Sequence, residues 1–122
     1  KAFLLWCSKN RRKTDKELYS WHTNPELNNR CDESGMDNSP RFDNVVNLQA
    51  IDFSCFMANE FRHMKLIAET LGEDGVCFEE AFENTKKAIN EKLWDEEDGF
   101  YYDYDIASGC IGKSDSIHGI IY

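Results

Sequence analysis

The sequence predicts a mainly α-helical fold, and three features of the chain support this prediction. Apolar residues recur at helical spacing over two long stretches, about residues 44–71 and 78–94. A short glycine-containing segment, 72–77, joins these stretches, and short connections between helices give antiparallel neighbours. Residues 100–112 are rich in aromatic and β-branched side chains around a turn signal, which is typical of a β-hairpin. We therefore expect an αα-hairpin, preceded by a long loop and followed by a small β-hairpin.

The composition excludes several classes of partner. The chain has 122 residues, with 14 Lys and Arg against 23 Asp and Glu, so its formal net charge is −9. Such a charge argues against nucleic acid and anionic membrane surfaces as partners, whereas a neutral ligand such as a sugar fits it. The length suits one domain or part of one, and we expect residues 1–122 to be a partial catalytic domain. No apolar run is long enough to span a bilayer, and no signal peptide is visible.

The first 43 residues predict one helix end and one long loop. Residues 2–7 form an apolar run without an N-cap before it, so we expect the end of a helix that belongs to a longer protein. From about residue 14 to 43 the dipeptides Asn24-Pro25 and Ser39-Pro40 break helix. A loop of this length in a compact domain is usually functional or disordered, and its aromatic residues favour an ordered one.

The long stretch 44–71 predicts a helix with Asp43 as its N-cap and Gly72 just after its end. Its apolar positions cover more than one face, so we expect burial on more than one side. The stretch 78–94 shows a cleaner apolar face, with acidic residues near its start and Lys92 near its end, as the helix dipole favours. In the resulting hairpin, we expect the second helix to face the first through apolar side chains. These are Phe82, Ile89 and Leu93 on one helix and Phe53, Phe61 or Met64 on the other.

Residues 95–112 predict a turn followed by strands. We expect a turn at 95–99, a strand over 100–105, a turn at 107–109 and a second strand over 110–112. The acidic residues of this region also invite a calcium-loop interpretation. An EF-hand loop, however, needs glycine at its sixth position, and Gly99 falls at the fifth position counted from Asp95. We therefore expect no metal and no cofactor.

The five cysteines are odd in number and lack the spacing of a metal site. Cys55 and Cys77 fall on helical stretches and are interpreted as small core residues. We expect reduced buried thiols, which favours a reducing compartment and hence a cytoplasmic location. Cys31 is either another such thiol or a reactive one, although no histidine lies near it in sequence.

The segment 32–43 carries the strongest functional signal. It reads Asp-Glu-Ser-Gly-Met-Asp-Asn-Ser-Pro-Arg-Phe-Asp, with four acidic residues and no hydrophobic periodicity. Such a segment is expected to form a surface or cavity-lining loop ordered by its own polar contacts.

This segment closely resembles the Glu-Ser-Gly-x-Asp-x-Ser-Pro-Arg-aromatic signature of inverting α-glycosidases built on an (α/α)6 barrel. Glycoside hydrolase family 63 and its trehalase-like relatives are similar to the chain over most of its length. The resemblance extends to Tyr19-Ser20-Trp21-His22-Thr23-Asn24-Pro25, to the two helices, and to the segment 93–103. It implies that the chain is part of an (α/α)6 barrel and that its substrate is an oligosaccharide or small glycoside. The remainder of the same polypeptide is then its other partner.

The resemblance also implies roles for individual residues. Asp37 takes the position of the general acid, whereas nothing in the chain matches the context of the family's catalytic base. Substrate-binding roles are expected for Trp21, Gly35, Met36, Asn38 and Arg41.

Chemical reasons support several of these roles. An acid catalyst must keep its proton, and the negative charges of Glu33 and Asp43 would help Asp37 to do so. Arg41 is expected either to donate hydrogen bonds to sugar hydroxyls or to pair with Glu33 or Asp43. Trp21 or Phe42 offers a flat ring on which the apolar face of a pyranose could stack.

Two other functional classes stay open at this point. The acidic loop could bind a protein partner, which would make the chain a helical interaction module. The chain could also be a carbohydrate-binding remnant without catalysis. A closed cleft with converging carboxylates would favour the enzyme, whereas a loop lying flat on the surface would favour interaction.

Overall fold

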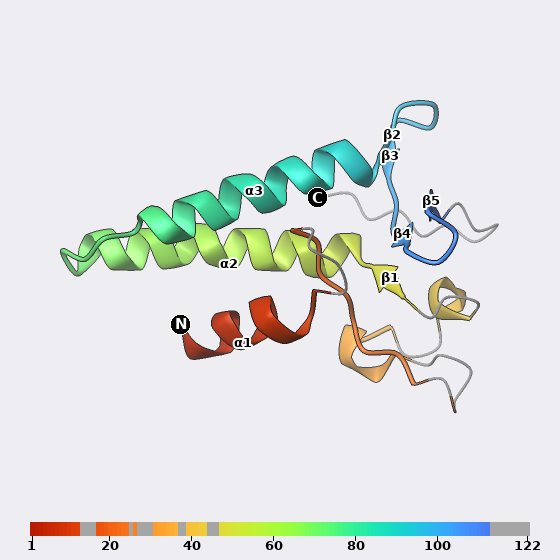
Figure 1. Ribbon diagram of the computed structural model, residues 1–122, viewed down its shortest axis with the longest axis horizontal. Coiled ribbons are helices and arrows are strands. Elements are labelled where there is room, and N and C mark those ends of the chain that lie inside the picture. The colour runs from red at the N-terminus through yellow and green to blue at the C-terminus, as the bar shows by residue number, and fades with distance from the viewer. Residues whose placement is uncertain (13–16, 25, 27–30, 37–38, 44–46, 113–122) are drawn as a thin grey trace.

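The computed structural model describes residues 1–12, 17–24, 26, 31–36, 39–43 and 47–112. In this part of the chain, the helices α1 (Ala2–Asn10), α2 (Ile51–Thr70) and α3 (Val76–Lys92) dominate. Figure 1 shows α2 and α3 running antiparallel, with α1 against the other side of α2 and the short strands gathered near the start of α2. The predicted mainly α-helical fold and its αα-hairpin are therefore confirmed, and the arrangement is compatible with part of an α/α barrel.

The end of α2 follows the sequence-based expectation. Gly72 adopts a φ of 73° just after the helix. Its N–H donates to the carbonyl of Glu69 at 3.1 Å, and the N–H of Glu73 donates to the carbonyl of Ala68 at 2.9 Å. These two bonds form a Schellman motif, which satisfies carbonyls that the helix itself leaves free. The glycine therefore ends α2 and turns the chain into α3.

The predicted start of this helix is wrong. The helix begins at Ile51 with Ala50 as its N-cap, while Leu48–Gln49 form the strand β1. Asp43, the expected N-cap, instead follows the short 3-10 helix η3 (Pro40–Phe42), and residues 44–46 lie outside the described part of the chain. The apolar spacing could not reveal this boundary because the partner of β1 is a distant strand, Tyr104–Asp105.

Two apolar clusters hold the hairpin together. The first joins α1 to α2 and the start of α3 through Leu4, Cys7, Phe53, Phe61 and Phe78, with Met64 and Phe82 packed against it. The second cluster contains Leu18, Ile51, Ala58, Ile89 and Leu93. The expected facing pairs are therefore correct for Phe82 but wrong for Ile89 and Leu93, which pack on a different stripe of α2.

The strands form two small antiparallel units. A three-stranded sheet has the order β1, β4 (Tyr104–Asp105), β5 (Cys110–Ile111), and β2 (Trp94–Asp95) pairs with β3 (Phe100–Tyr101). The predicted hairpin of β4 and β5 is confirmed, whereas the expected continuous strand over 100–105 is divided in two. The interruption matters for the site, since it places Asp103 between β3 and β4.

The long N-terminal loop is ordered partly by burial. Its described residues include the 3-10 helices η2 (Asp32–Ser34) and η3. Cys31 and Phe42 are buried together with Leu48 in a third apolar cluster. The expectation that the segment 32–43 forms a surface or cavity-lining loop is therefore wrong for Arg41 and Phe42, which are buried, whereas Asp32, Glu33, Gly35 and Met36 are exposed.

The cysteines are free thiols. Among the described residues, which include all five cysteines, no disulfide is formed. Burial raises the pKa of Cys31, which disfavours a reactive thiolate at this position. Cys77 is exposed, so its predicted core position is wrong.

Several large apolar side chains are exposed, as expected for part of a larger helical barrel. On α1, Phe3 is 71% exposed and Trp6 is 48% exposed, and on α2 Phe56 is 50% exposed. Within the described residues, no helix combines the length and the apolar character that crossing a bilayer requires.

We predict that Gly72→Ala lowers the free energy of unfolding by about 1 kcal/mol, because an L-residue with a side chain is strained at this positive φ. No atom lies within 4 Å of the position of the added Cβ, so the loss arises from the backbone and not from a clash. The matched variant Gly72→Asn should lose less, since asparagine tolerates this conformation. Urea unfolding of both variants measures the difference, and equal losses would contradict the assigned cause.

Candidate functional site

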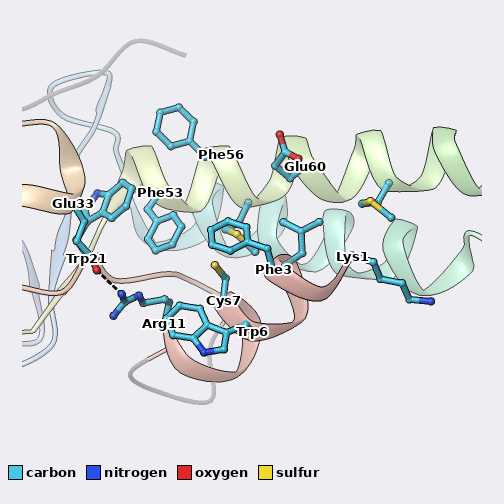
Figure 2. A pocket seen from close by; sticks show the side chains of 13 residues that line it. Lys1, Phe3, Trp6, Cys7, Arg11, Trp21, Glu33, Phe53, Phe56 and Glu60 are labelled. Carbon is cyan, nitrogen blue, oxygen red and sulfur yellow. Dashed lines mark hydrogen bonds and ion pairs between the residues drawn. The ribbon is translucent and has the colours of Figure 1, made fainter.

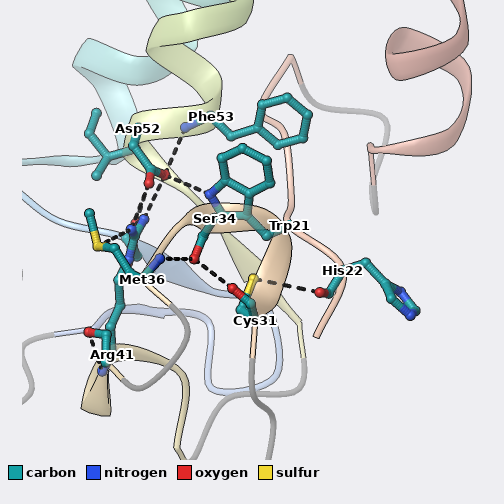
Figure 3. A network of polar contacts seen from close by, with 11 residues as sticks. Trp21, His22, Cys31, Ser34, Met36, Arg41, Asp52 and Phe53 are labelled. Carbon is teal, nitrogen blue, oxygen red and sulfur yellow. Dashed lines mark hydrogen bonds and ion pairs between the residues drawn. The ribbon is translucent and has the colours of Figure 1, made fainter. Parts of the chain in front are cut away.

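The centre of the candidate site is a buried ionic cluster of Arg41, Asp52 and Asp103. Figure 3 shows the contact between Arg41 and Asp52. Arg41 is 5% exposed, Asp52 is 2% exposed and Asp103 is 3% exposed. The three residues come from η3, from the first turn of α2 and from the link between β3 and β4. Segments up to 62 positions apart in sequence therefore meet at one guanidinium.

Within the described residues, all five N–H donors of Arg41 have acceptors. Nη1 donates to Asp52 Oδ2 at 2.8 Å and lies 3.8 Å from the sulfur of Met36. Nη2 donates to Asp52 Oδ1 at 2.8 Å and to Asp103 Oδ1 at 2.7 Å, and Nε donates to Asp103 Oδ2. The guanidinium thus forms two forked contacts, whose geometry fixes its plane as well as its position.

The start of α2 contributes to the same cluster. Ala50, the N-cap, has no side-chain acceptor for the free N–H groups of the first turn. Asp103 Oδ1 accepts the N–H of Ile51 at 2.9 Å, and Asp52 Oδ1 accepts the N–H of Phe53 at 2.7 Å. Both carboxylates therefore also lie at the positive end of the helix dipole, which favours negative charge.

The two carboxylates respond differently to burial. For Asp52, burial by itself would raise the pKa, but the Arg41 guanidinium and the Trp21 indole N–H outweigh it and lower the pKa. For Asp103, burial dominates and raises the pKa, and the bonds to Arg41 and Ile51 offset it only in part. Asp52 differs from Asp103 in having the Trp21 indole N–H as an additional donor to its carboxylate.

The loop next to the cluster carries the sequence signature. The N–H of Met36 donates to Ser34 Oγ at 3.0 Å, and the N–H of Ser39 donates to the carbonyl of Met36 at 2.9 Å. Ser39 Oγ in turn accepts the N–H of Arg41 at 3.3 Å. Gly35 has a φ of 72° and is exposed, so the chain bends there with open space around its Cα. The residues on both sides of positions 37 and 38 are therefore held by hydrogen bonds.

Trp21 connects the cluster to a cavity. Its indole Nε1 donates to Asp52 Oδ1 at 3.0 Å, and its ring stacks on Phe53 with centroids 4.1 Å apart and an interplanar angle of 11°. Figure 2 shows Trp21 at one end of a cavity of about 620 Å³ between α1 and α2. Apolar side chains such as Phe3 and Met57 line most of this cavity, and charged groups from Arg11 and Glu33 lie at the Trp21 end.

Glu33 is occupied by local contacts. It forms an ion pair with Arg11 and accepts the backbone N–H of His22 at 3.0 Å. Its charge is thus partly neutralised by a neighbouring cation. Asp43, the other expected supporting acid, is exposed at the end of η3.

The positions of the predicted site residues differ from expectation in two cases. Arg41 pairs with neither Glu33 nor Asp43, and its donors are occupied, so its expected direct contact with sugar hydroxyls needs revision to an indirect role. Phe42 is 1% exposed, which rules out its ring as a sugar platform in this structure. Asp37 and Asn38 lie outside the described residues.

Sequence reasoning missed Asp52 and Asp103 as members of the site. Asp52 lies within an apolar helical stretch, and Asp103 was grouped with the acidic residues of a possible calcium loop. In the structure, Asp103 is bound to Arg41. No group of three potential metal-binding side chains occurs within the residues that the structure describes. A usable signal was that Asp52 is the only acidic residue between residues 44 and 59 of the chain.

Comparison with known proteins identifies the class of protein that this fold and site define. The chain belongs to glycosyl hydrolase family 63, because the model of that family's C-terminal domain matches residues 1–114. The name of this family is that of a class of enzymes, the glycosyl hydrolases.

One curated protein is similar to part of the chain. Mannosylglycerate hydrolase from Rubrobacter radiotolerans is 39% identical to the chain over 63 residues. The match covers 52% of this chain and 14% of the relative, so the matched region is a small part of that enzyme. No solved structure matches the chain.

We predict that Arg41→Lys lowers the free energy of unfolding by about 2–4 kcal/mol, because lysine keeps the charge but cannot form two forked contacts in a buried site. Arg62→Lys on the exposed face of α2 is the matched control and should change stability by less than about 0.5 kcal/mol. Chemical denaturation measures both values. Similar small losses for the two variants would show that the forked geometry contributes little.

Proposed function

We propose that the chain is the general-acid segment of an inverting glycoside hydrolase that cleaves α-glycosidic bonds, with Asp37 as the acid. The observation that carries the proposal is the family match over residues 1–114, which includes the signature segment 33–41. The structure supports it because Met36 and Ser39, which flank positions 37 and 38, are held by hydrogen bonds.

The proposed reaction needs two carboxyl groups on opposite sides of the scissile bond. Asp37 would protonate the leaving oxygen, while a carboxylate base would remove a proton from the attacking water. In inverting enzymes these groups lie about 6.5–9.5 Å apart, which leaves room for that water. We propose that the base comes from a part of the polypeptide other than residues 1–122.

The surroundings of the turn support an acid that keeps its proton. Arg41 lies four positions from Asp37, and a free guanidinium there would favour the ionised carboxylate. The structure instead surrounds this cation with Asp52 and Asp103. The cluster therefore offers no uncompensated positive charge to lower the pKa of an acid on the turn.

Trp21, Gly35, Met36 and Asn38 are proposed to contribute to the sugar site. One face of the Trp21 indole is occupied by Phe53, so a pyranose would stack on the other face. Gly35 and Met36 are exposed on the turn, where they can approach a ligand. Glu33 and Asp43 would add negative charge around the acid.

The substrate is proposed to be a small α-glycoside or an oligosaccharide. Mannosylglycerate is the first compound to test, because the relative from Rubrobacter radiotolerans is named as its hydrolase. The free thiols are consistent with a reducing compartment, and on that ground we propose a cytoplasmic location.

A helical protein-interaction module is the second candidate function. The exposed apolar residues of α1 and α2, including Phe3, Trp6 and Phe56, favour this candidate. In the glycoside hydrolase, the same surface would be covered by the remainder of the same polypeptide.

We predict that isolated residues 1–122 do not hydrolyse α-glycosides. They carry the proposed acid but no recognised base, and a single carboxyl group would lose most of the rate. Release of reducing sugar from a panel of α-glycosides that includes mannosylglycerate measures this. Turnover above the rate of a heat-denatured sample would contradict the proposed division of the catalytic groups.

In the full-length protein, Asp37→Asn is predicted to lower the rate on a glycoside by about 10²–10⁴. The loss on the corresponding glycosyl fluoride should be far smaller, because fluoride departs with little help from a proton donor. The alkaline limb of the pH–rate profile, which reports the protonated acid, should disappear in the variant.

The comparison of the two substrates decides between roles for Asp37. Equal losses on both would show that this residue positions the sugar or the loop. No loss on either would mean that Asp37 is not part of the catalytic machinery.

A further inference from the structure

We propose that Asp52 and Asp103 are positioning residues for glycosidic bond cleavage, which they serve by holding Arg41 and, through it, the turn that carries the acid. This inference rests on the proposed function of Asp37. It assigns a role in the reaction to two carboxylates that are too deeply buried to meet a sugar themselves.

The first set of contacts joins Arg41 to α2 and to the segment between β3 and β4. Asp103 lies between two strand pairs, and its carboxylate binds Nε and Nη2 of Arg41 as well as the first N–H of α2. Asp52 binds Nη1 and Nη2 of Arg41 from the first turn of the same helix. Since α2 and the small sheet are both packed, Arg41 is fastened to rigid elements on two sides.

The second set of contacts joins Arg41 to Met36 and Ser39, which flank positions 37 and 38. Its Nη1 lies 3.8 Å from the sulfur of Met36, and its backbone N–H donates to Ser39 Oγ. The N–H of Ser39 donates to the carbonyl of Met36 at 2.9 Å. Arg41 thus contacts the residue before position 37 and the residue after position 38. A shift of its guanidinium would therefore be transmitted to both ends of the segment that carries Asp37.

The chemical nature of the cluster favours a positioning role over simple support. Two buried carboxylates and one guanidinium have a large desolvation cost, and apolar residues of similar volume often give equal or greater stability. Forked ionic contacts, however, fix direction as well as distance. A general acid requires such precision, because a displacement of about 1 Å can lower a rate by about 10².

Asp52 makes a further hydrogen bond, to Trp21, that Asp103 lacks. Its Oδ1 accepts the Trp21 indole N–H at 3.0 Å, and Trp21 lines the cavity between α1 and α2. Loss of the Asp52 carboxylate should therefore disturb both the acid turn and the proposed sugar platform. Loss of the Asp103 carboxylate should disturb the acid turn alone.

The test uses the full-length enzyme and two substrates, a glycoside that it hydrolyses and the corresponding glycosyl fluoride. Asp103→Asn is expected to lower kcat on the glycoside by about 10–10² and on the fluoride by less than about threefold. Asp52→Asn should show the same difference in kcat together with a raised KM. A misplaced acid lowers mainly the rate on the glycoside, because its leaving group needs a proton. A general loss of folded enzyme lowers the rates on both substrates equally.

Asp105→Asn is the matched control. It removes a carboxylate two positions along the chain that accepts the N–H groups of Ala107 and Ser108 in the turn between β4 and β5. Its effect, if any, should be equal on the two substrates. If Asp103→Asn yields no folded enzyme, Asp103→Glu carries the test, because it keeps the charge while displacing the guanidinium. The same difference between substrates is then expected, with a smaller loss.

The outcomes separate this inference from the proposed function. Folded Asp103 variants with equal losses on the two substrates, or with none, would overturn the positioning role. If Asp37→Asn shows the difference between substrates while the Asp103 variants do not, the inference alone fails. If Asp37→Asn itself shows no difference, the proposed acid is wrong and the positioning role fails with it.

Discussion

The fold around the candidate site depends on the burial of Arg41 between Asp52 and Asp103. One guanidinium cannot fully neutralise two buried carboxylates, so the arrangement requires further donors. The N–H groups at the start of α2 and the Trp21 indole provide them. Removal of Arg41 would leave two buried carboxylates without their cation. Its contacts join the helix start, the signature loop and the link between β3 and β4.

The burial of Arg41 between two carboxylates also relates the structure to the proposed function. In the proposed reaction the acid needs a defined position, but the described residues of the signature segment have no regular secondary structure beyond two single-turn 3-10 helices. Such a loop gains precision from contacts with rigid elements. Here α2 and the small sheet supply those contacts through Arg41. The sugar-facing surface can then stay polar and exposed while its support is buried.

The large cavity between α1 and α2 has a different character from the turn. Exposed Phe3, Trp6 and Phe56 border an apolar space, which suits packing by other helices better than binding of a sugar along its whole length. The end near Trp21, Arg11 and Glu33 combines a flat ring with an ion pair. That end is joined to the ionic cluster by the hydrogen bond from Trp21 to Asp52.

The sequence by itself determined the helical class, the αα-hairpin and the turn at Gly72, because these depend on local periodicity and on a residue that tolerates positive φ. It also placed the signature segment 32–43 on a loop, through its polar composition and the family resemblance. Only the tertiary structure decided that residues 48–49 form a strand and that Ile89 and Leu93 pack on a separate stripe. The partners of Arg41 were likewise decided there, since the segments that meet at its guanidinium are up to 62 positions apart and no local pattern encodes such a contact.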